Sequence, residues 1–190
     1  MNVTSRFKQP VLLSGSVLLS HPSLRDPNFS KTVVFLSNHS ESEGTLGVVL
    51  NRPLEKTLTQ MDKEFAKLSI GDCPVYDGGP VDKDKLILAA WDWKDKEHSF
   101  RLHFGIDITK AESLIAQKKN IHVASFLGHS GWSPGQLEDE LDANTWILSS
   151  LSFQIFNHID KKSECWRSTI SSMSDELRLQ ANAPEKPWRN

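Results

Sequence analysis

The densest group of residues that could do chemistry lies in the run F-L-G-H-S-G-W-S-P-G-Q-L-E-D-E-L, which begins at Phe126. A glycine-bent approach followed by a helix start rich in carboxylates can line a pocket, and an indole in the approach can form its wall. The alternative is a well-capped helix whose acidic side faces water. The candidate ligand-binding residues of this run are Gly131, Trp132, Gln136, Glu138 and Glu140.

The start of the expected helix has recognisable capping signals. Ser133 is a good N-cap, Pro134 suits the first helical position, and Gln136 stands where a capping box needs Glu or Gln. Glu138 and Glu140 are two residues apart, so on a helix they point in different directions. They are therefore not a ready-made acid–base pair.

His129 is the one candidate for acid–base chemistry, within a G-H-S-G-W sequence that we expect to form a turn. A hydrolase would use it with Asp26 or Glu138, whereas a solvent-facing turn histidine is the simpler interpretation. The chain contains no H-E-x-x-H motif, and its seven histidines lack metal-ligand spacing. The sequence therefore assigns no catalytic residue, metal ligand or cofactor.

Three further loops carry polar groups or paired glycines. Asp26, in S-H-P-S-L-R-D-P-N-F, can face a ligand or close an Asx-turn. Asn51 and Arg52 end an apolar run, where arginine is a good anion binder or simply an exposed cation in a turn. Gly78 and Gly79 allow close backbone approach, although D-G-G-P lacks the phosphate-loop patterns.

We expect these loops to meet the run from Trp132 to Glu140 at one concave site. Such a site would hold mixed charge, because Arg52 approaches from one side and Glu138 and Glu140 from the other. We therefore expect a zwitterionic or mixed polar small molecule, or a peptide segment, as the ligand. Arg52 would either bind it or hold a buried carboxylate in place.

Three ordered motifs resemble one family. They are L-L-S-H-P-S-L-R-D-P-N-F-S-K-T-V-V-F-L running into G-T-L-G-V-V-L-N-R-P-L, then Y-D-G-G-P-V, then G-W-S-P-G-Q-L-E-D-E. The chain is similar over about residues 12–157 to the YqgE/AlgH family of bacterial proteins. The resemblance supports ligand contact by Asp26 and Arg52. It implies a suggested role in transcriptional regulation, with no established reaction, cofactor or substrate.

Charge and composition argue against direct nucleic-acid binding. The 190 residues include 22 basic and 24 acidic ones, and adjacent lysines occur only as isolated pairs. Phosphate-backbone binding requires clustered Lys and Arg, so a regulatory effect would be indirect. Two cysteines are too few for a disulfide framework or a zinc cluster and indicate reduced thiols.

No stretch approaches the roughly 20 apolar residues that a membrane-spanning helix needs. The apolar residues near the N-terminus are interrupted by S-G-S, which favours a strand over a signal peptide. We therefore expect a cytoplasmic protein without membrane association. Its oligomeric state and partner, a small molecule or a protein, are not determined by the sequence.

Strand-like runs alternate with a few capped helices. Strands are expected at residues 11–19, 32–37, 45–50, 75–76, 85–91, 98–104 and 121–127, with a turn at 38–44. Capping boxes at Thr57–Gln60 and Thr109–Glu112 predict two helices, and 146–156 could form another. The pattern predicts an α+β or mixed-sheet α/β fold with three or four helices. We expect one compact domain over residues 1–190. Within it, residues 161–190 form a polar C-terminal extension with a loose end.

Overall fold

The computed structural model describes residues 13–94, 99–118 and 120–183. Over these residues it has nine strands in one mixed sheet and six α-helices, which confirms the predicted α+β single domain and exceeds the predicted number of helices. The ends of the expected first strand and of the strand predicted at residues 98–104 lie partly outside the described residues, as does the predicted loose end at 184–190.

The sheet follows the order β4-β5-β8-β3-β2-β1-β9, and a long β6–β7 hairpin joins it through β8. The β5–β8 pair is parallel, and the other pairs are antiparallel. The strands are β1 (Ser16–Ser20), β2 (Val33–Ser40), β3 (Gly44–Val49), β4 (Pro53–Thr57), β5 (Pro74–Asp77), β6 (Val81–Lys94), β7 (Ser99–Ile106), β8 (His122–Trp132) and β9 (Trp146–Ser150).

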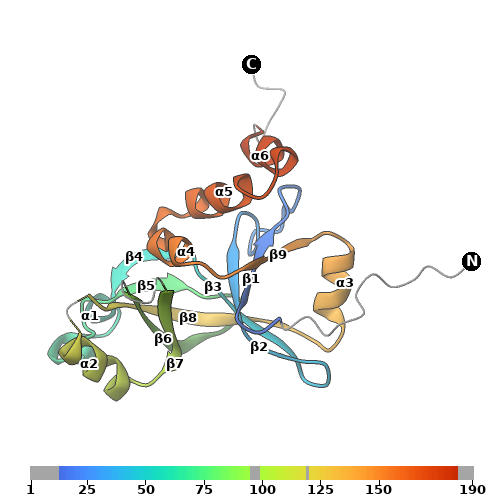
Figure 1. Cartoon of the computed structure of the whole chain (residues 1–190). Helices are drawn as coiled ribbons and strands as arrows, with labels where there is room; N and C mark the ends of the chain where they lie inside the picture. Colours follow the sequence, from blue (N-terminus) through green and yellow to red (C-terminus); the bar gives the residue numbers. More distant parts are fainter. Residues whose placement is uncertain (1–12, 95–98, 119, 184–190) are drawn as a thin grey trace, which may run out of the picture.

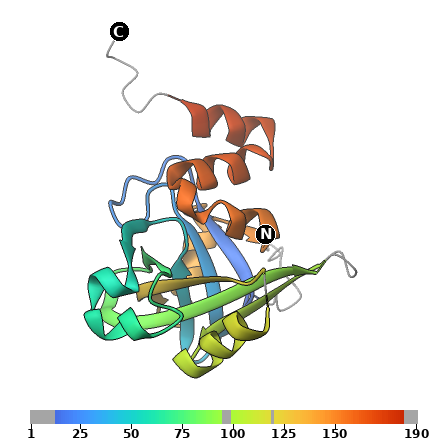
Figure 2. The same cartoon turned by 90° about the vertical axis from the view of Figure 1, so that its left-hand side faces the viewer.

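The helices lie at three separate places around the sheet (Figure 1). Helices α4, α5 and α6 stack above one end, α1 and α2 lie toward the far end of β6–β8, and α3 lies beside β9. Figure 2 shows α4 to α6 above the sheet again, with α1 at the left and α2 at the lower edge. The helices are α1 (Leu58–Met61), α2 (Ile108–Gln117), α3 (Gln136–Asp142), α4 (Phe153–Asn157), α5 (Ser163–Ser171) and α6 (Asp175–Asn182), with short 3-10 turns η1 (Lys63–Lys67) and η3 (Ile159–Lys161).

Most of β1, the first four residues of β2 and the last three of β3 are buried on both faces, which explains their nearly continuous apolar runs. Val17 and Leu19 point into a first core that α4, α5 and the β6–β8 strands complete. Leu18, between them, points into a second core that contains Trp132, Leu137 and other residues packed near α3. Strand alternation thus divides one apolar sequence between two cores.

Strand β8 continues through the G-H-S-G-W sequence, so the prediction of a turn there was wrong. Phe126 packs in the first core and Trp132 in the second. They are an even number of residues apart, so on a regular strand both side chains would point to the same face. Between them Gly128 has a φ of +73°, a conformation that glycine adopts without a Cβ clash. The strand changes face at this glycine, which periodicity alone does not reveal.

One predicted helix start is confirmed and two begin with a different N-cap residue. The capping box of Thr57 and Gln60 is present at α1. Asp107, not Thr109, caps α2, because its carboxylate accepts the Lys110 N–H at 2.7 Å. Helix α3 begins at Gln136 after a left-handed Gly135, so Ser133 is not its N-cap.

The predicted helix over 146–156 is instead a strand followed by a helix. Strand β9 pairs with all five residues of β1, and helix α4 begins only at Phe153. Beyond it, the polar segment from residue 161 forms α5 and α6 and supplies buried side chains, including Trp166, to the first core. Sparse apolar residues at helical spacing account for this packing.

No helix within the described ranges is both long and apolar enough to cross a membrane.

Candidate functional site

The Asp26 loop is a compact turn stabilised by its own carboxylate. Oδ1 of Asp26 accepts the backbone N–H groups of Asn28 at 2.8 Å and Phe29 at 3.1 Å. This is the Asx-turn alternative, in which the side chain fixes the loop. From the other side, Arg52 donates through Nη2 to the Pro27 carbonyl at 3.0 Å. Asp26 therefore positions its neighbours.

Asn51 is buried, and its amide is fully occupied within the protein. Oδ1 accepts the Val33 N–H at 2.8 Å, and Nδ2 donates to the carbonyls of Lys31 at 3.0 Å and Lys162 at 2.9 Å. These bonds join the end of β3 to the start of β2 and to the residue before α5. The amide connects three segments and does not line the pocket described next.

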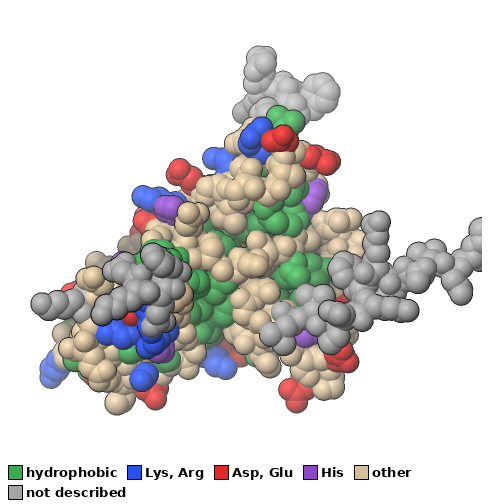
Figure 3. All heavy atoms as spheres, viewed as in Figure 1, with side chains coloured by type: hydrophobic (Ala, Val, Ile, Leu, Met, Phe, Trp, Pro, Cys, Tyr) green, Lys and Arg blue, Asp and Glu red, His purple; other side chains and the backbone are tan. Residues whose placement is uncertain are grey.

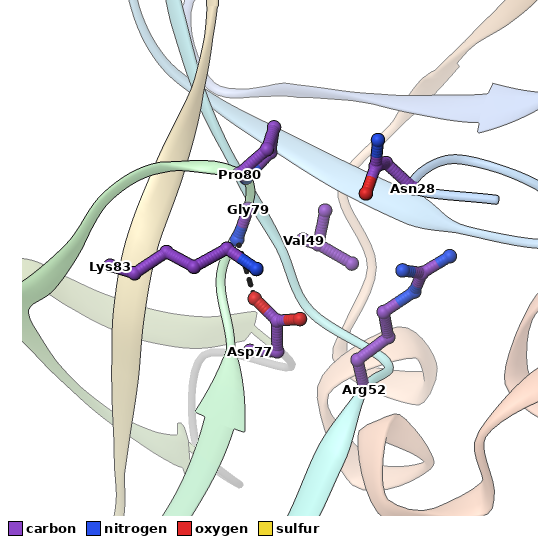
Figure 4. A pocket seen from close by; sticks show the side chains of 7 residues that line it. All are labelled: Asn28, Val49, Arg52, Asp77, Gly79, Pro80 and Lys83. Carbon is purple, nitrogen blue, oxygen red and sulfur yellow. Dashed lines mark hydrogen bonds between the residues drawn. The ribbon is translucent and has the colours of Figure 1, made fainter. Parts of the chain in front are cut away.

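A polar pocket lies where the three predicted loops meet (Figure 4). We call it the Arg52 pocket; its space of about 190 Å³ includes open solvent, and its enclosed part has room for about one water molecule. The Asp77 N–H donates to the Arg52 carbonyl at 2.8 Å, which holds two of the loops together. The lining residues are Asn28, Val49, Arg52, Asp77, Gly79, Pro80 and Lys83.

Three charged side chains reach this pocket from three different elements. Arg52 follows β3, Asp77 ends β5, and Lys83 lies in β6. Among the described residues no ion pair within 4 Å joins any of the three to a partner, and Asp77 accepts only the Gly79 N–H, at 3.2 Å. Lys83 was not predicted to lie at the site, because a lysine in the run V-D-K-D-K has the pattern of an ordinary surface residue.

Gly78 and Gly79 allow the loop to approach β8 closely. A Cβ on Gly78 would lie 2.4 Å from the Gly128 carbonyl oxygen, and one on Gly79 would lie 2.3 Å from the His129 carbonyl oxygen. Gly79 also has a φ of +146°, which side chains disfavour. The paired glycines therefore place Asp77 and Gly79 at the pocket. Gly79 lines the pocket, whereas Gly78 is not one of its lining residues.

We call residues 131–140, the last of the three family motifs, the signature block; with Trp146 it forms a closed hydrogen-bond network. The Glu140 carboxylate accepts the indole N–H groups of Trp132 at 2.9 Å and Trp146 at 2.6 Å. It also accepts the Gln136 amide at 2.9 Å, while Oε1 of Gln136 accepts the Ser133 N–H. The functional groups of Trp132, Gln136 and Glu140 are thus used to hold α3 against β8 and β9.

Glu138 points away from this network, as its position two residues from Glu140 predicts. Its Oε1 lies 3.5 Å from Nε2 of His39, whose Nδ1 is 2.7 Å from Oγ1 of Thr45. Oε2 of Glu138 is buried and has no hydrogen-bond partner. This group joins α3 to the β2–β3 hairpin.

His129 lies in β8 opposite Val81 and is half-buried. Among the described side chains, neither Asp26 nor Glu138 forms an ion pair with it. These contacts therefore do not bring His129 together with Asp26 or Glu138 as a hydrolase site would require.

The expected single site is thus divided in two. Arg52 and Gly79 line the Arg52 pocket, and Asp26 holds the turn beside it. No candidate residue of the signature block lines the Arg52 pocket. Gly131 is exposed and pairs with Leu46 of β3. Trp132, Gln136, Glu138 and Glu140 lie in or beside α3, across the molecule from β4 and β5 (Figure 1). The Asp26 turn touches both regions, because Asn28 lines the pocket and Phe29 packs edge-on against Trp146 with ring centroids 5.5 Å apart.

Both thiols are free and buried. Burial raises the pKa of Cys73 to about 11 and that of Cys165 to about 12. A thiol acts as a nucleophile or metal ligand through its thiolate, so neither cysteine is poised for such chemistry near neutral pH.

A family model described as AlgH-like matches residues 17–178. The chain belongs to the AlgH-like family. Among similar proteins, a UPF0301 protein of Chlorobium phaeobacteroides is 31% identical over 196 residues, covering 94% of this chain and 96% of the relative. A UPF0301 protein of Streptomyces avermitilis is 31% identical over 191 residues, covering 94% and 95%. These matches confirm the family predicted from the three motifs.

Two solved structures share the fold. The crystal structure of a Corynebacterium diphtheriae protein has a TM-score of 0.67 and 19% identity, covering 93% of this chain and 95% of the other. The solution structure of the AlgH protein from Pseudomonas aeruginosa has a TM-score of 0.61 and 24% identity, covering 96% and 100%. At these identities the similarity establishes the architecture.

Proposed function

We propose that this AlgH-like protein is a binding module whose ligand occupies the Arg52 pocket. The observation that supports this is the convergence of Arg52, Lys83 and Asp77 without ion pairs between them. Lys83 is exposed and Arg52 and Asp77 are half-buried, so all three side chains can meet a ligand from solvent. The Arg52 guanidinium, the Lys83 ammonium and the Asp77 carboxylate thus line the same pocket.

The ligand is a small polar molecule or peptide segment with an anionic group and a hydrogen-bond donor. The anionic group fits between Arg52 and Lys83, which supply a planar fork and a point charge. The donor, an ammonium or hydroxyl group, fits against Asp77, and the Asn28 amide adds a donor and an acceptor. Two cations and one carboxylate favour a ligand that is zwitterionic with an excess of negative charge.

A regulatory role would follow from this ligand and would be indirect. The excess of acidic over basic residues gives no reason to expect phosphate-backbone binding. In a gel-shift titration at physiological salt we expect no appreciable binding of the isolated protein to duplex DNA. Tight, salt-sensitive binding in that titration would replace the proposed role with a direct one.

The binding proposal can be tested with a panel of amino acids, dicarboxylates and phosphorylated metabolites, using thermal shift and then calorimetry. Loss of one charge-assisted contact costs about 1.5–3 kcal/mol, so Arg52→Ala and Lys83→Gln should each weaken binding at least about tenfold. Lys67→Gln, an exposed lysine in η1, is the matched control and should bind normally. A ligand whose affinity is equal in all four proteins would place its site elsewhere.

A further inference from the structure

One face of the β6–β7 hairpin packs on the first core, and the opposite face is apolar only near α2, where Leu88 and Ile106 join Ala111 in a third core. Phe100, Leu102 and Phe104 pack towards the first core. Arg101 and His103 alternate with them and therefore point to the opposite face. This face also carries Asp92, which lies directly opposite Arg101 in the register of the hairpin.

Helix α2 brings two lysines to the same face. At the C-terminal end of the helix, Nζ of Lys118 lies 2.9 Å from Oδ1 of Asp92. Asp92 is therefore paired with Lys118 and has Arg101 as its cross-strand neighbour on the same face. Lys110 comes from the first turn of the same helix. Figure 3 shows Lys and Arg side chains gathered beside a histidine over α2 and β7.

The carboxylates around this face are already engaged. Asp92 pairs with Lys118, Asp107 caps α2, and Glu112 accepts the Ser69 N–H at 3.0 Å. No described carboxylate lies within ion-pair distance of Arg101 or Lys110. With Lys118 paired to Asp92, Arg101 and Lys110 give the described part of this face an excess of positive charge.

His103 lies within the field of these cations. Burial lowers the pKa of His103, and Lys118, Arg101 and Lys110 lower it further, against an opposing effect of Asp92. Three cations on two elements thus act on one half-buried ring. The pH titration of the His103 ring, followed by NMR, therefore reports on any negative charge that binds next to these cations.

We propose that Arg101, Lys110 and Lys118 form a second binding site, for a compact multivalent oxyanion of the phosphate or pyrophosphate class. An arginine fork and two ammonium groups are the groups that recognise phosphoryl oxygens. The site uses β7 and α2, whereas the Arg52 pocket uses the loops at β3, β5 and β6. Three cations are too few to track a nucleic-acid backbone, so a small phosphorylated molecule is the ligand.

The test is a titration of the full chain with sodium pyrophosphate, followed by NMR of the histidine ring signals at constant ionic strength. A bound anion stabilises the imidazolium, so saturation should move the His103 titration to higher pH. His122, which stacks on Trp91 at 5.7 Å in the neighbouring strand, is an internal reference and should move much less. An unchanged His103 titration would overturn the proposal.

Variants separate this site from other anion binding. Arg101→Gln removes one charge-assisted contact and should weaken pyrophosphate binding about tenfold, with Lys110→Gln as a second variant. Lys67→Gln and Arg52→Ala should leave the His103 response unchanged. Equal responses in wild type and both site variants would show non-specific attraction and refute the site. A response lost in Arg52→Ala would assign the anion to the Arg52 pocket instead.

Discussion

The Arg52 pocket and the signature block around Trp132 use polar residues in opposite ways. In the signature block, Glu140 accepts three side-chain hydrogen bonds and both indole N–H groups find their partner in it. In the Arg52 pocket, the charged ends of Arg52, Asp77 and Lys83 have no ion-pair partner among the described residues. The segment richest in recognisable motif residues is thus the more structural of the two.

This difference shows why residue types alone do not locate a binding site. A carboxylate that satisfies two indole N–H groups stabilises the fold, because a buried donor without a partner costs about 1–3 kcal/mol. A charged group that the protein leaves unpaired retains its capacity to bind a ligand. Four variants test this contrast, beginning with the largest expected effect.

Gly79→Ala should cause the largest loss of stability, about 4 kcal/mol. Its Cβ would lie 2.3 Å from the His129 carbonyl oxygen, at a φ of +146°, so strain and overpacking add together. Gly131→Ala is the matched control, since nothing lies within 4 Å of its Cβ, and should change stability by less than about 0.5 kcal/mol. Urea denaturation measures both; equal losses would show that the Gly79 approach is not required.

Glu140→Ala should lower the free energy of unfolding by about 3 kcal/mol, because it leaves two indole donors and the Gln136 amide without their acceptor. Glu140→Gln keeps one acceptor oxygen and should lose less. Asp139→Ala, an exposed neighbour on α3, serves as the control. A Glu140→Ala protein as stable as the control would remove the structural role of the network.

Asn51→Ala should cost about 2 kcal/mol, since it deletes three hydrogen bonds that connect β2, β3 and α5. Asn51→Asp preserves the acceptor for the Val33 N–H but faces two carbonyl oxygens with a carboxylate, so it should also destabilise. Thermal and chemical denaturation of both variants measure this effect. If either protein kept full stability and lost ligand affinity, Asn51 would belong to the binding site.

Arg52→Ala should have the smallest effect on folding, less than about 1 kcal/mol, because the side chain makes one exposed hydrogen bond to the Pro27 carbonyl. Its effect should appear in ligand binding instead. A loss of about 3–5 kcal/mol is expected only for the partner of a buried carboxylate. Chemical denaturation showing such a loss would make Arg52 structural and remove it from the pocket.

Local patterns predicted a large part of this architecture. The family motifs, the α1 capping box and most strands were correct, since each depends on neighbouring residues. Asp26 had two local interpretations, and the contacts of its carboxylate show the Asx-turn. The strand at 146–150 was missed because its pairing partner, β1, lies more than a hundred residues earlier in the chain.

The sequence by itself determined the family, the α+β class and the three loops that surround the Arg52 pocket. Only the tertiary structure decided which polar groups stay unpaired, because pairing depends on distances between segments far apart in the chain. In the fold the Glu140 carboxylate accepts the indole N–H groups of Trp132 and Trp146, and the Asn51 amide donates to the Lys162 carbonyl. Lys83 lines the same pocket as Arg52. Side-chain chemistry sets what a residue can bind, whereas packing determines whether the protein itself has already bound it.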